Sequence, residues 1–149
     1  MSAAASDDCV LTLERRLKAN PDRVFAAWIE PAQLAQWFGP EGMTIPSQAI
    51  DARVGGGWTV TMRDPQGNDR TVSGVYRDID RPKRLAFTWA WHHDGKRGHE
   101  TDVVVEFKRD GDGTLIRLTQ QTFETAHDRD MHNMGWSSSF NDLARLVEV

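Results

Sequence analysis

The sequence predicts an α+β domain in which a curved antiparallel sheet packs against one long helix. Three observations lead to this prediction. Between residues 47 and 122, apolar and polar residues alternate in short runs separated by turns, as in consecutive strands. One more strand and two short helices precede this region, and apolar residues recur at helical spacing after it. A helix across the concave face of the sheet buries the apolar faces of both.

Length and charge limit the class of protein. The chain has 149 residues and a formal net charge of −4. This length is typical of a single domain, which we expect over residues 9–149, after a disordered leader at residues 1–8. The one cysteine, Cys9, excludes an intramolecular disulfide and favours a reducing compartment. We expect a cytoplasmic monomer or homodimer that binds neither nucleic acid nor membrane, because the sequence has no basic cluster and no membrane-spanning run.

The first elements are a strand and two helices. A strand is predicted over residues 9–17, with its apolar residues on one face. Two short helices follow, and each begins at a proline, Pro21 after the cap residue Asn20 and Pro31 after Glu30. Gly39-Pro40 ends the second helix, and a loop is expected up to Pro46.

Six strands are expected next as an antiparallel meander, because only short turns separate them. The glycines at residues 55–57 are interpreted as a hairpin turn, and residues 92–98 as a polar loop. The expected strands are residues 47–54, 58–62, 71–79, 85–91, 101–108 and 115–121.

The last predicted element is a helix from about residue 128 to residue 147. At 100° per residue, Trp136, Phe140, Leu143 and Val147 fall on one narrow stripe, with His132 one turn earlier. This stripe is the face that we expect to pack against the sheet.

No motif in the sequence is typical of a catalytic, metal or cofactor site. The spacing of the five histidines fits no metal-ligand pattern, and the glycines at residues 55–57 lack the lysine and the helix of a phosphate loop. We therefore expect no cofactor and no metal, and the sequence favours binding over covalent chemistry.

Large aromatic residues are the most informative feature. The chain has six tryptophans and six phenylalanines, many of them on strand and helix faces expected to converge. Rings on a curved wall favour an apolar cavity; the alternative is that they only fill the core. His132 and Tyr76 are the polar candidates to orient a ligand, unless each is only a satisfied core residue. The candidate ligand-binding residues are Trp37, Phe38, Trp58, Met62, Tyr76, Phe87, Trp89, Trp91, His132, Trp136, Phe140 and Leu143.

Several short motifs occur in an order and spacing that resemble a known family. They include Ala19-Asn20-Pro21, Trp37-Phe38-Gly39-Pro40-Glu41-Gly42, Gly74-Val75-Tyr76, Phe87-Thr88-Trp89 and Gly135-Trp136. The sequence resembles the START-like (SRPBCC, helix-grip) superfamily, in the branch named for the activator of the heat-shock-protein-90 ATPase. The resemblance implies a seven-stranded curved antiparallel sheet wrapped around the C-terminal helix, two short helices between strands one and two, and a cavity between sheet and helix.

Three functions are compatible with this fold. The first is binding or carriage of a small apolar or lipid-like ligand without catalysis. The second is a stress-related module that interacts with a chaperone, and the third is a cyclase- or hydrolase-type enzyme that uses the same cavity. Co-chaperones of the family carry a separate N-terminal domain, whereas the resemblance here begins close to Met1, so we expect this chain not to stimulate the chaperone by itself.

Overall fold

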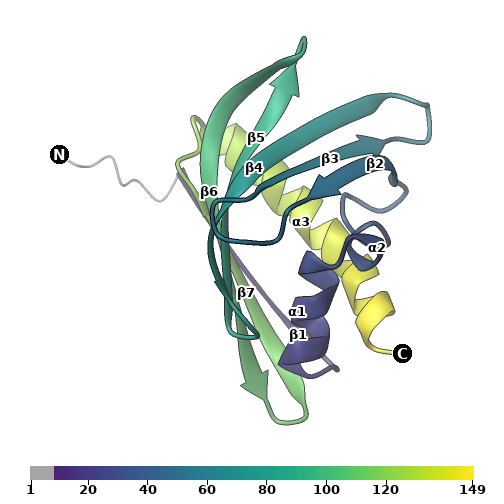
Figure 1. Ribbon diagram of the computed structural model, residues 1–149, viewed down its shortest axis with the longest axis vertical. Helices are drawn as coiled ribbons and strands as arrows, with labels where there is room; N and C mark the ends of the chain where they lie inside the picture. The colour runs from purple at the N-terminus through teal and green to yellow at the C-terminus, as the bar shows by residue number, and fades with distance from the viewer. Residues whose placement is uncertain (1–8) are drawn as a thin grey trace, which may run out of the picture.

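Seven strands form one antiparallel sheet in the computed structural model, which describes residues 9–149 (Figure 1). Their order across the sheet is β1-β7-β6-β5-β4-β3-β2, so the first strand pairs with the last. The expected leader at residues 1–8 lies outside the described residues. The strands are β1 (Val10–Leu17), β2 (Thr44–Ile50), β3 (Gly57–Arg63), β4 (Asp69–Asp80), β5 (Arg84–His93), β6 (Lys96–Asp110) and β7 (Gly113–Gln121).

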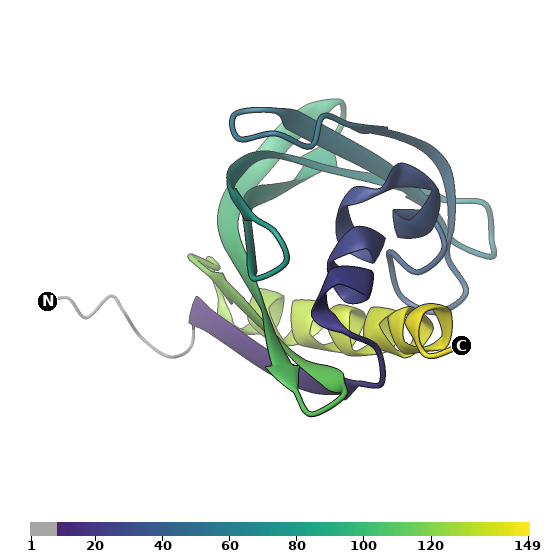
Figure 2. The same ribbon diagram turned by 60° about the horizontal axis from the view of Figure 1, so that its bottom comes forward.

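Within residues 9–149, three helices lie on the concave side of this sheet. Helices α1 (Pro21–Ile29) and α2 (Pro31–Leu34) connect β1 to β2, and α3 (Ala126–Val147) follows β7. Figure 2 shows the sheet curving around α1 and α3. The predicted stripe of α3 is buried, since Trp136, Phe140, Leu143 and Val147 are each at most 4% exposed. The predicted α+β helix-grip fold is confirmed.

Side-chain caps fix the start of the two longer helices. The Asn20 side chain accepts a hydrogen bond from the Arg23 amide at 2.9 Å, and Pro21 occupies the first turn of α1. The Thr125 hydroxyl accepts one from the Asp128 amide at 3.0 Å, so α3 begins at Ala126, slightly earlier than expected. None of the helices within residues 9–149 has the length and hydrophobicity needed to cross a membrane.

Gly74 allows the sheet to curve tightly between β3, β4 and β5. A Cβ atom at this position would lie 1.8 Å from the Thr88 carbonyl oxygen and 2.6 Å from Nε1 of Trp58. Trp58 stands opposite Gly74 in the β3–β4 register, so its indole covers the backbone that the glycine leaves bare. Only glycine permits this close approach.

Two predicted loops are wrong in extent. The loop expected up to Pro46 is shorter, because strand β2 begins at Thr44. The strand expected over residues 47–54 ends at Ile50, and residues 51–56 form a loop in which Val54 is 62% exposed. The Arg53 amide donates to the Asp51 carbonyl at 2.8 Å, and this turn ends the strand earlier than the alternation predicts.

The predicted polar loop at residues 92–98 is instead a tight hairpin. Asp94 and Gly95 have φ values of 52° and 79°, which are typical of a two-residue type I′ turn. This turn lets β5 extend to His93 and β6 begin at Lys96.

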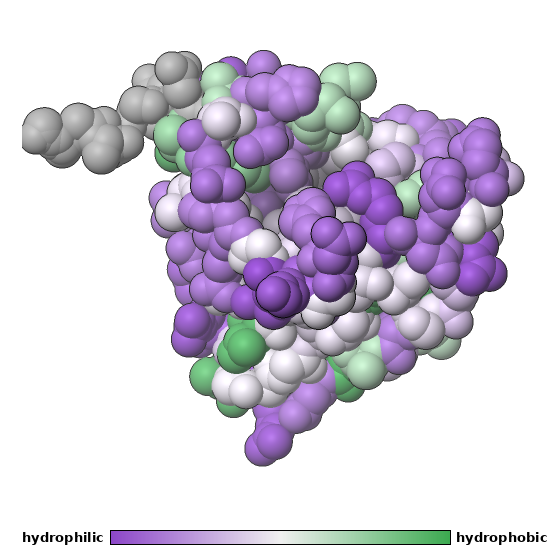
Figure 3. Space-filling model, turned by 90° about the horizontal axis from the view of Figure 1, so that it is seen from above, coloured by the Kyte–Doolittle hydropathy of each residue, from purple (hydrophilic) through white to green (hydrophobic). Residues whose placement is uncertain are grey.

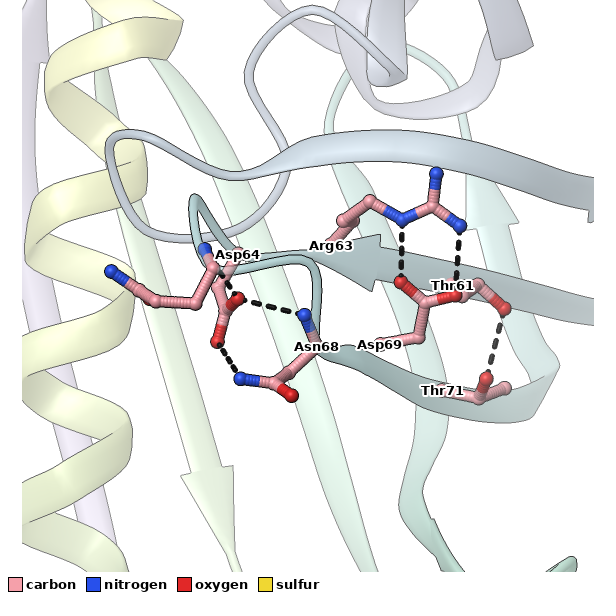
Figure 4. A network of polar contacts seen from close by, with 7 residues as sticks. Thr61, Arg63, Asp64, Asn68, Asp69 and Thr71 are labelled. Atoms are coloured by element: carbon pink, nitrogen blue, oxygen red, sulfur yellow. Dashed lines mark hydrogen bonds and ion pairs between the residues drawn. The ribbon is translucent and has the colours of Figure 1, made fainter.

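The β3–β4 hairpin is held by polar contacts on its outer face (Figure 4). Arg63 donates two hydrogen bonds to the Asp69 carboxylate, at 2.8 and 3.1 Å, and the Thr61 and Thr71 hydroxyls are 2.8 Å apart. In the turn, one Asp64 carboxylate oxygen accepts the backbone amides of residues 66 and 68, both at 2.9 Å. These contacts fix the start of β4, where the concave face carries the next residue, Arg70.

Candidate functional site

A cavity of about 710 Å³ lies between the first half of α3 and the concave face of the sheet. The loop at residues 39–43 borders it on a third side. Its wall is largely apolar and aromatic, while two exposed methionines, Met131 and Met134, stand on the same side of α3, 53% and 67% exposed. A pocket of this size and composition is typical of a small-molecule site.

The structure divides the predicted site residues into two groups. Six line the cavity, namely Phe38, Met62, Trp89, Trp91, His132 and Trp136. The other six lie in the closed core and do not line it, namely Trp37, Trp58, Tyr76, Phe87, Phe140 and Leu143.

The two groups differ because the two halves of α3 lie in different surroundings. The second half of α3 carries Phe140 and Leu143 into the core next to α1 and β1. Arg15 of β1, for example, donates a 2.6 Å hydrogen bond to Asn141. The first half lies beside the start of β4, the end of β5 and the start of β6, and the cavity occupies the space there.

A buried chain of hydrogen bonds fixes the inner wall. Nε1 of Trp136 donates to Oε1 of Gln120 at 2.8 Å, and Nε2 of Gln120 donates to the Thr101 hydroxyl at 2.9 Å. That hydroxyl donates in turn to the Trp89 carbonyl at 3.3 Å. Gln120 is 0% exposed, so both of its amide atoms depend on these partners. The chain joins α3 to β7, β6 and β5 and holds the Trp136 indole in place.

His132 is oriented by hydrogen bonds at both ring nitrogens. Nδ1 lies 2.7 Å from the Asp128 carbonyl oxygen, which can only accept, so this nitrogen carries the proton. Nε2 accepts a hydrogen bond from the Trp91 indole at 2.9 Å. Burial lowers the pKa of His132 below its ordinary 6.5, and the charge of Arg70 contributes, although the Asp128 carbonyl and carboxylate act in the opposite direction. The imidazole is therefore neutral and positions Trp91.

Tyr76, the second polar candidate, lies in the core. Its ring packs 6.3 Å from that of Phe87, and it is 4% exposed. Burial, and then the charge of Asp51, raise the pKa of Tyr76 to about 12. Its hydroxyl is neutral and does not line the cavity.

The loop beside the cavity is fastened to α3 by Glu41. Its carboxylate accepts hydrogen bonds from Asn141 at 3.0 Å and Arg145 at 2.9 Å, and its backbone amide donates to the Ser138 hydroxyl at 2.7 Å. Gly39 and Gly42, on either side, have φ values of +91° and +94°, which favour glycine.

Sequence reasoning missed several residues that line the cavity or hold its wall in place. Phe123, whose ring centroid lies 4.8 Å from that of His132, follows the last strand in an irregular segment where periodicity gives no signal. Gln120 had a signal, because it continues the alternation of the buried Ile116 and Leu118. Arg70 had none, because a single arginine at the start of a strand is typical of a solvated surface.

Two other kinds of site are a metal centre and a hydrophobic surface patch. Within residues 9–149, no three His, Cys, Asp or Glu side chains converge in a way that could hold a metal ion. Figure 3 looks onto the end of the molecule where the β5–β6 hairpin projects, and that face is mostly hydrophilic with small, separate hydrophobic patches.

Comparison with known proteins agrees with this architecture. The sequence matches the family model described as Activator of Hsp90 ATPase homolog 1-like protein over residues 18–148. It matches no curated protein.

Solved bacterial structures are similar over nearly the whole chain. A protein from Chromobacterium violaceum is 27% identical, with a TM-score of 0.86 over 94% of this chain and 97% of that one. The AHSA1 protein from Silicibacter pomeroyi is 33% identical, with a TM-score of 0.84 over 91% and 95%. A protein from Nitrosomonas europaea is 26% identical, with a TM-score of 0.81 and 95% of each chain covered. The protein therefore belongs to the family of Activator of Hsp90 ATPase homolog 1-like proteins, within the START-like superfamily.

Proposed function

We propose that this protein binds a small, largely apolar ligand in the cavity between the first half of α3 and the concave sheet, without covalent chemistry. One observation carries the proposal: the cavity of about 710 Å³ has rings of Phe38, Trp89 and Trp136 in its wall. Hydrogen bonds within the protein hold Trp136, so the wall is in place before a ligand arrives. Such preorganisation reduces the entropy lost on binding.

The expected affinity follows from the surface that a ligand can bury. A ligand that buries roughly 200 Å² of apolar surface gains about 5 kcal/mol at ~25 cal/mol per Å², before the cost of association. Apolar contact alone thus supports weak binding, and a polar group on the ligand must provide the rest.

Gly135 offers a direct test of the proposal. It lines the cavity, and a Cβ atom there would meet only Pro40, at 3.8 Å. The Gly135→Leu variant therefore fills the cavity without a clash at the backbone. The matched Gly135→Ala variant adds only a methyl group, and it stabilises α3 by about 1 kcal/mol through helix propensity.

The probe is N-phenyl-1-naphthylamine, a neutral apolar dye that fluoresces in apolar surroundings. We expect saturable binding to the natural protein and to Gly135→Ala, and loss of binding in Gly135→Leu, while circular dichroism shows all three folded. Equal binding to both variants, or no binding to the natural protein, would contradict the proposal.

Interaction with a chaperone is a second candidate, and the family match is the observation that favours it. The large hydrophobic residues exposed within residues 9–149 are Val54, Met131, Met134 and Val149, which lie in a loop, on α3 and at the C-terminus rather than across the outer sheet face. Titration of the purified chaperone from the same host, with ATP hydrolysis as the readout, tests this candidate. Stimulation that persists in Gly135→Leu would assign it to a surface other than the cavity.

A further inference from the structure

Arg70 places a positive charge at the edge of the apolar cavity. It lies on β4 opposite Met62 of β3, one pair before Val72 in the row of residues on the concave face. Its side chain lines the cavity, and the guanidinium carbon lies 4.2 Å from the centroid of the Trp91 ring. A guanidinium stacked on an indole keeps the N–H groups at its edge free for hydrogen bonds.

Arg70 forms no ion pair with a carboxylate in the part of the chain that the structure describes. The adjacent Asp69 is held by Arg63 in a two-bond contact on the outer face of the sheet. Arg70 is thus available to an anion from outside.

The stacking surface beneath Arg70 is itself fixed. Trp91 donates its indole hydrogen to His132, and His132 donates to the Asp128 carbonyl of α3. Arg70, Trp91 and His132 therefore form a continuous series of contacts from β4 to the helix. An anion that binds Arg70 meets a group that is already oriented.

Other charged groups restrict what kind of anion fits. Glu124 and Asp128 also line the cavity, near the start of α3, and a carboxylate oxygen of Glu124 lies 4.0 Å from Nδ1 of His99. His93, exposed at the end of β5, lines the cavity as well. With a single arginine and two carboxylates in the lining, an anion of one negative charge is favoured over a phosphate that carries two. The planar fork of Arg70 matches a carboxylate.

We infer that the ligand is an amphipathic monocarboxylate, with its carboxylate on Arg70 and its apolar body against Trp89 and Trp136. This inference rests on the ligand binding proposed above and adds the chemical class of the ligand. The apolar body occupies the interior, and the carboxylate supplies the polar contact that apolar burial alone lacks.

The test compares decanoate with decanol, which share a chain length and differ in the head group. Decanoate is titrated below its micelle-forming concentration and decanol below its solubility limit. Each is added to protein loaded with N-phenyl-1-naphthylamine, and displacement of the dye is measured. The variant is Arg70→Gln, and the matched control is Arg77→Gln, which makes the same change in charge at an exposed position on the same strand.

We expect Arg70→Gln to weaken decanoate binding by roughly tenfold or more, as for loss of a charged hydrogen bond, and to leave decanol and the dye nearly unchanged. Arg77→Gln is expected to leave all three unchanged. If both variants bind decanoate alike, or if Arg70→Gln weakens decanol equally, the carboxylate assignment is wrong although the cavity still binds. If the natural protein binds no dye, the ligand-binding proposal itself fails, and this inference fails with it.

Discussion

The contact between His132 and Trp91 shows how one side chain shapes the site. Because Nδ1 keeps its proton and donates it in a hydrogen bond to the Asp128 carbonyl, Nε2 is left with a lone pair that only a donor such as the Trp91 indole can satisfy. A proton on Nε2 would remove this acceptor and place two N–H groups against each other. The wall near Arg70 therefore depends on a neutral imidazole.

This dependence gives a prediction for stability against pH. The pKa of His132 is lower in the folded protein than its ordinary 6.5, so the unfolded chain takes up this proton first as the pH falls. The contribution of the neutral His132 to stability is fully present above pH 6.5. It is lost as the pH falls from there through the folded-state pKa. In urea unfolding at neutral and mildly acidic pH, His132→Gln should lose less stability on acidification than the natural protein.

The control for this prediction is His127→Gln, since His127 is exposed on the same helix. It should follow the natural protein at every pH. A parallel loss of stability in the natural protein and in His132→Gln would show that His132 is not held neutral.

The sequence predicts which side chains face inward better than it predicts which of these line the cavity. The stripe from His132 to Val147 and the strand alternation identify which side chains face inward, because these periods follow from backbone geometry. Whether an inward side chain lines a cavity depends on the distance between two elements that are remote in sequence. Trp136 and Phe140 are one turn apart on the same face of α3, yet only Trp136 lines the cavity.

At the scale of elements, we expect the loop at residues 39–43 to control access to the cavity. It borders the cavity, and Glu41 joins it to Asn141 and Arg145 of α3. The hydrogen bond from Asn141, and then that from Arg145, lower the pKa of Glu41 below its ordinary 4.5. The contact is thus present at neutral pH, and it is lost only as the pH falls through this lowered pKa.

We predict that Glu41→Ala makes the dye enter and leave the cavity several-fold faster, with little change in affinity, because the fastening is lost while the wall is kept. Stopped-flow fluorescence measures both rates. Asp142→Ala is the control, since Asp142 also pairs with Arg145 but lies on α3 itself. If the rates in Glu41→Ala match those of the control, the loop does not limit access.

The sequence contains a signal for the tight β5–β6 hairpin, although a longer loop was predicted there. Asp94-Gly95 is a dipeptide typical of type I′ turns, but the polar residues around it favoured a longer loop. The early start of β2 had no such signal, because Pro46 argues against a strand unless the strand lies at an edge, as β2 does.

At the scale of the whole molecule, α3 has two structural roles in the helix-grip fold. Its second half packs into the core, and its first half forms one wall of the cavity. Sequence patterns were sufficient for the fold, since every apolar face needed a partner. They were not sufficient for the location of the cavity, which depends on where along its length the helix stands away from the sheet.

The methionines permit the most direct test of ligand binding in this cavity. Four of the five methionines, Met43, Met62, Met131 and Met134, line it, and Met1 lies outside the described residues. In protein labelled with ¹³C at the methionine methyl groups, we predict intermolecular NOEs between bound N-phenyl-1-naphthylamine and several of these four methyls. Saturable dye binding that leaves all four methyl resonances unchanged would contradict the account, because the dye would then occupy another site.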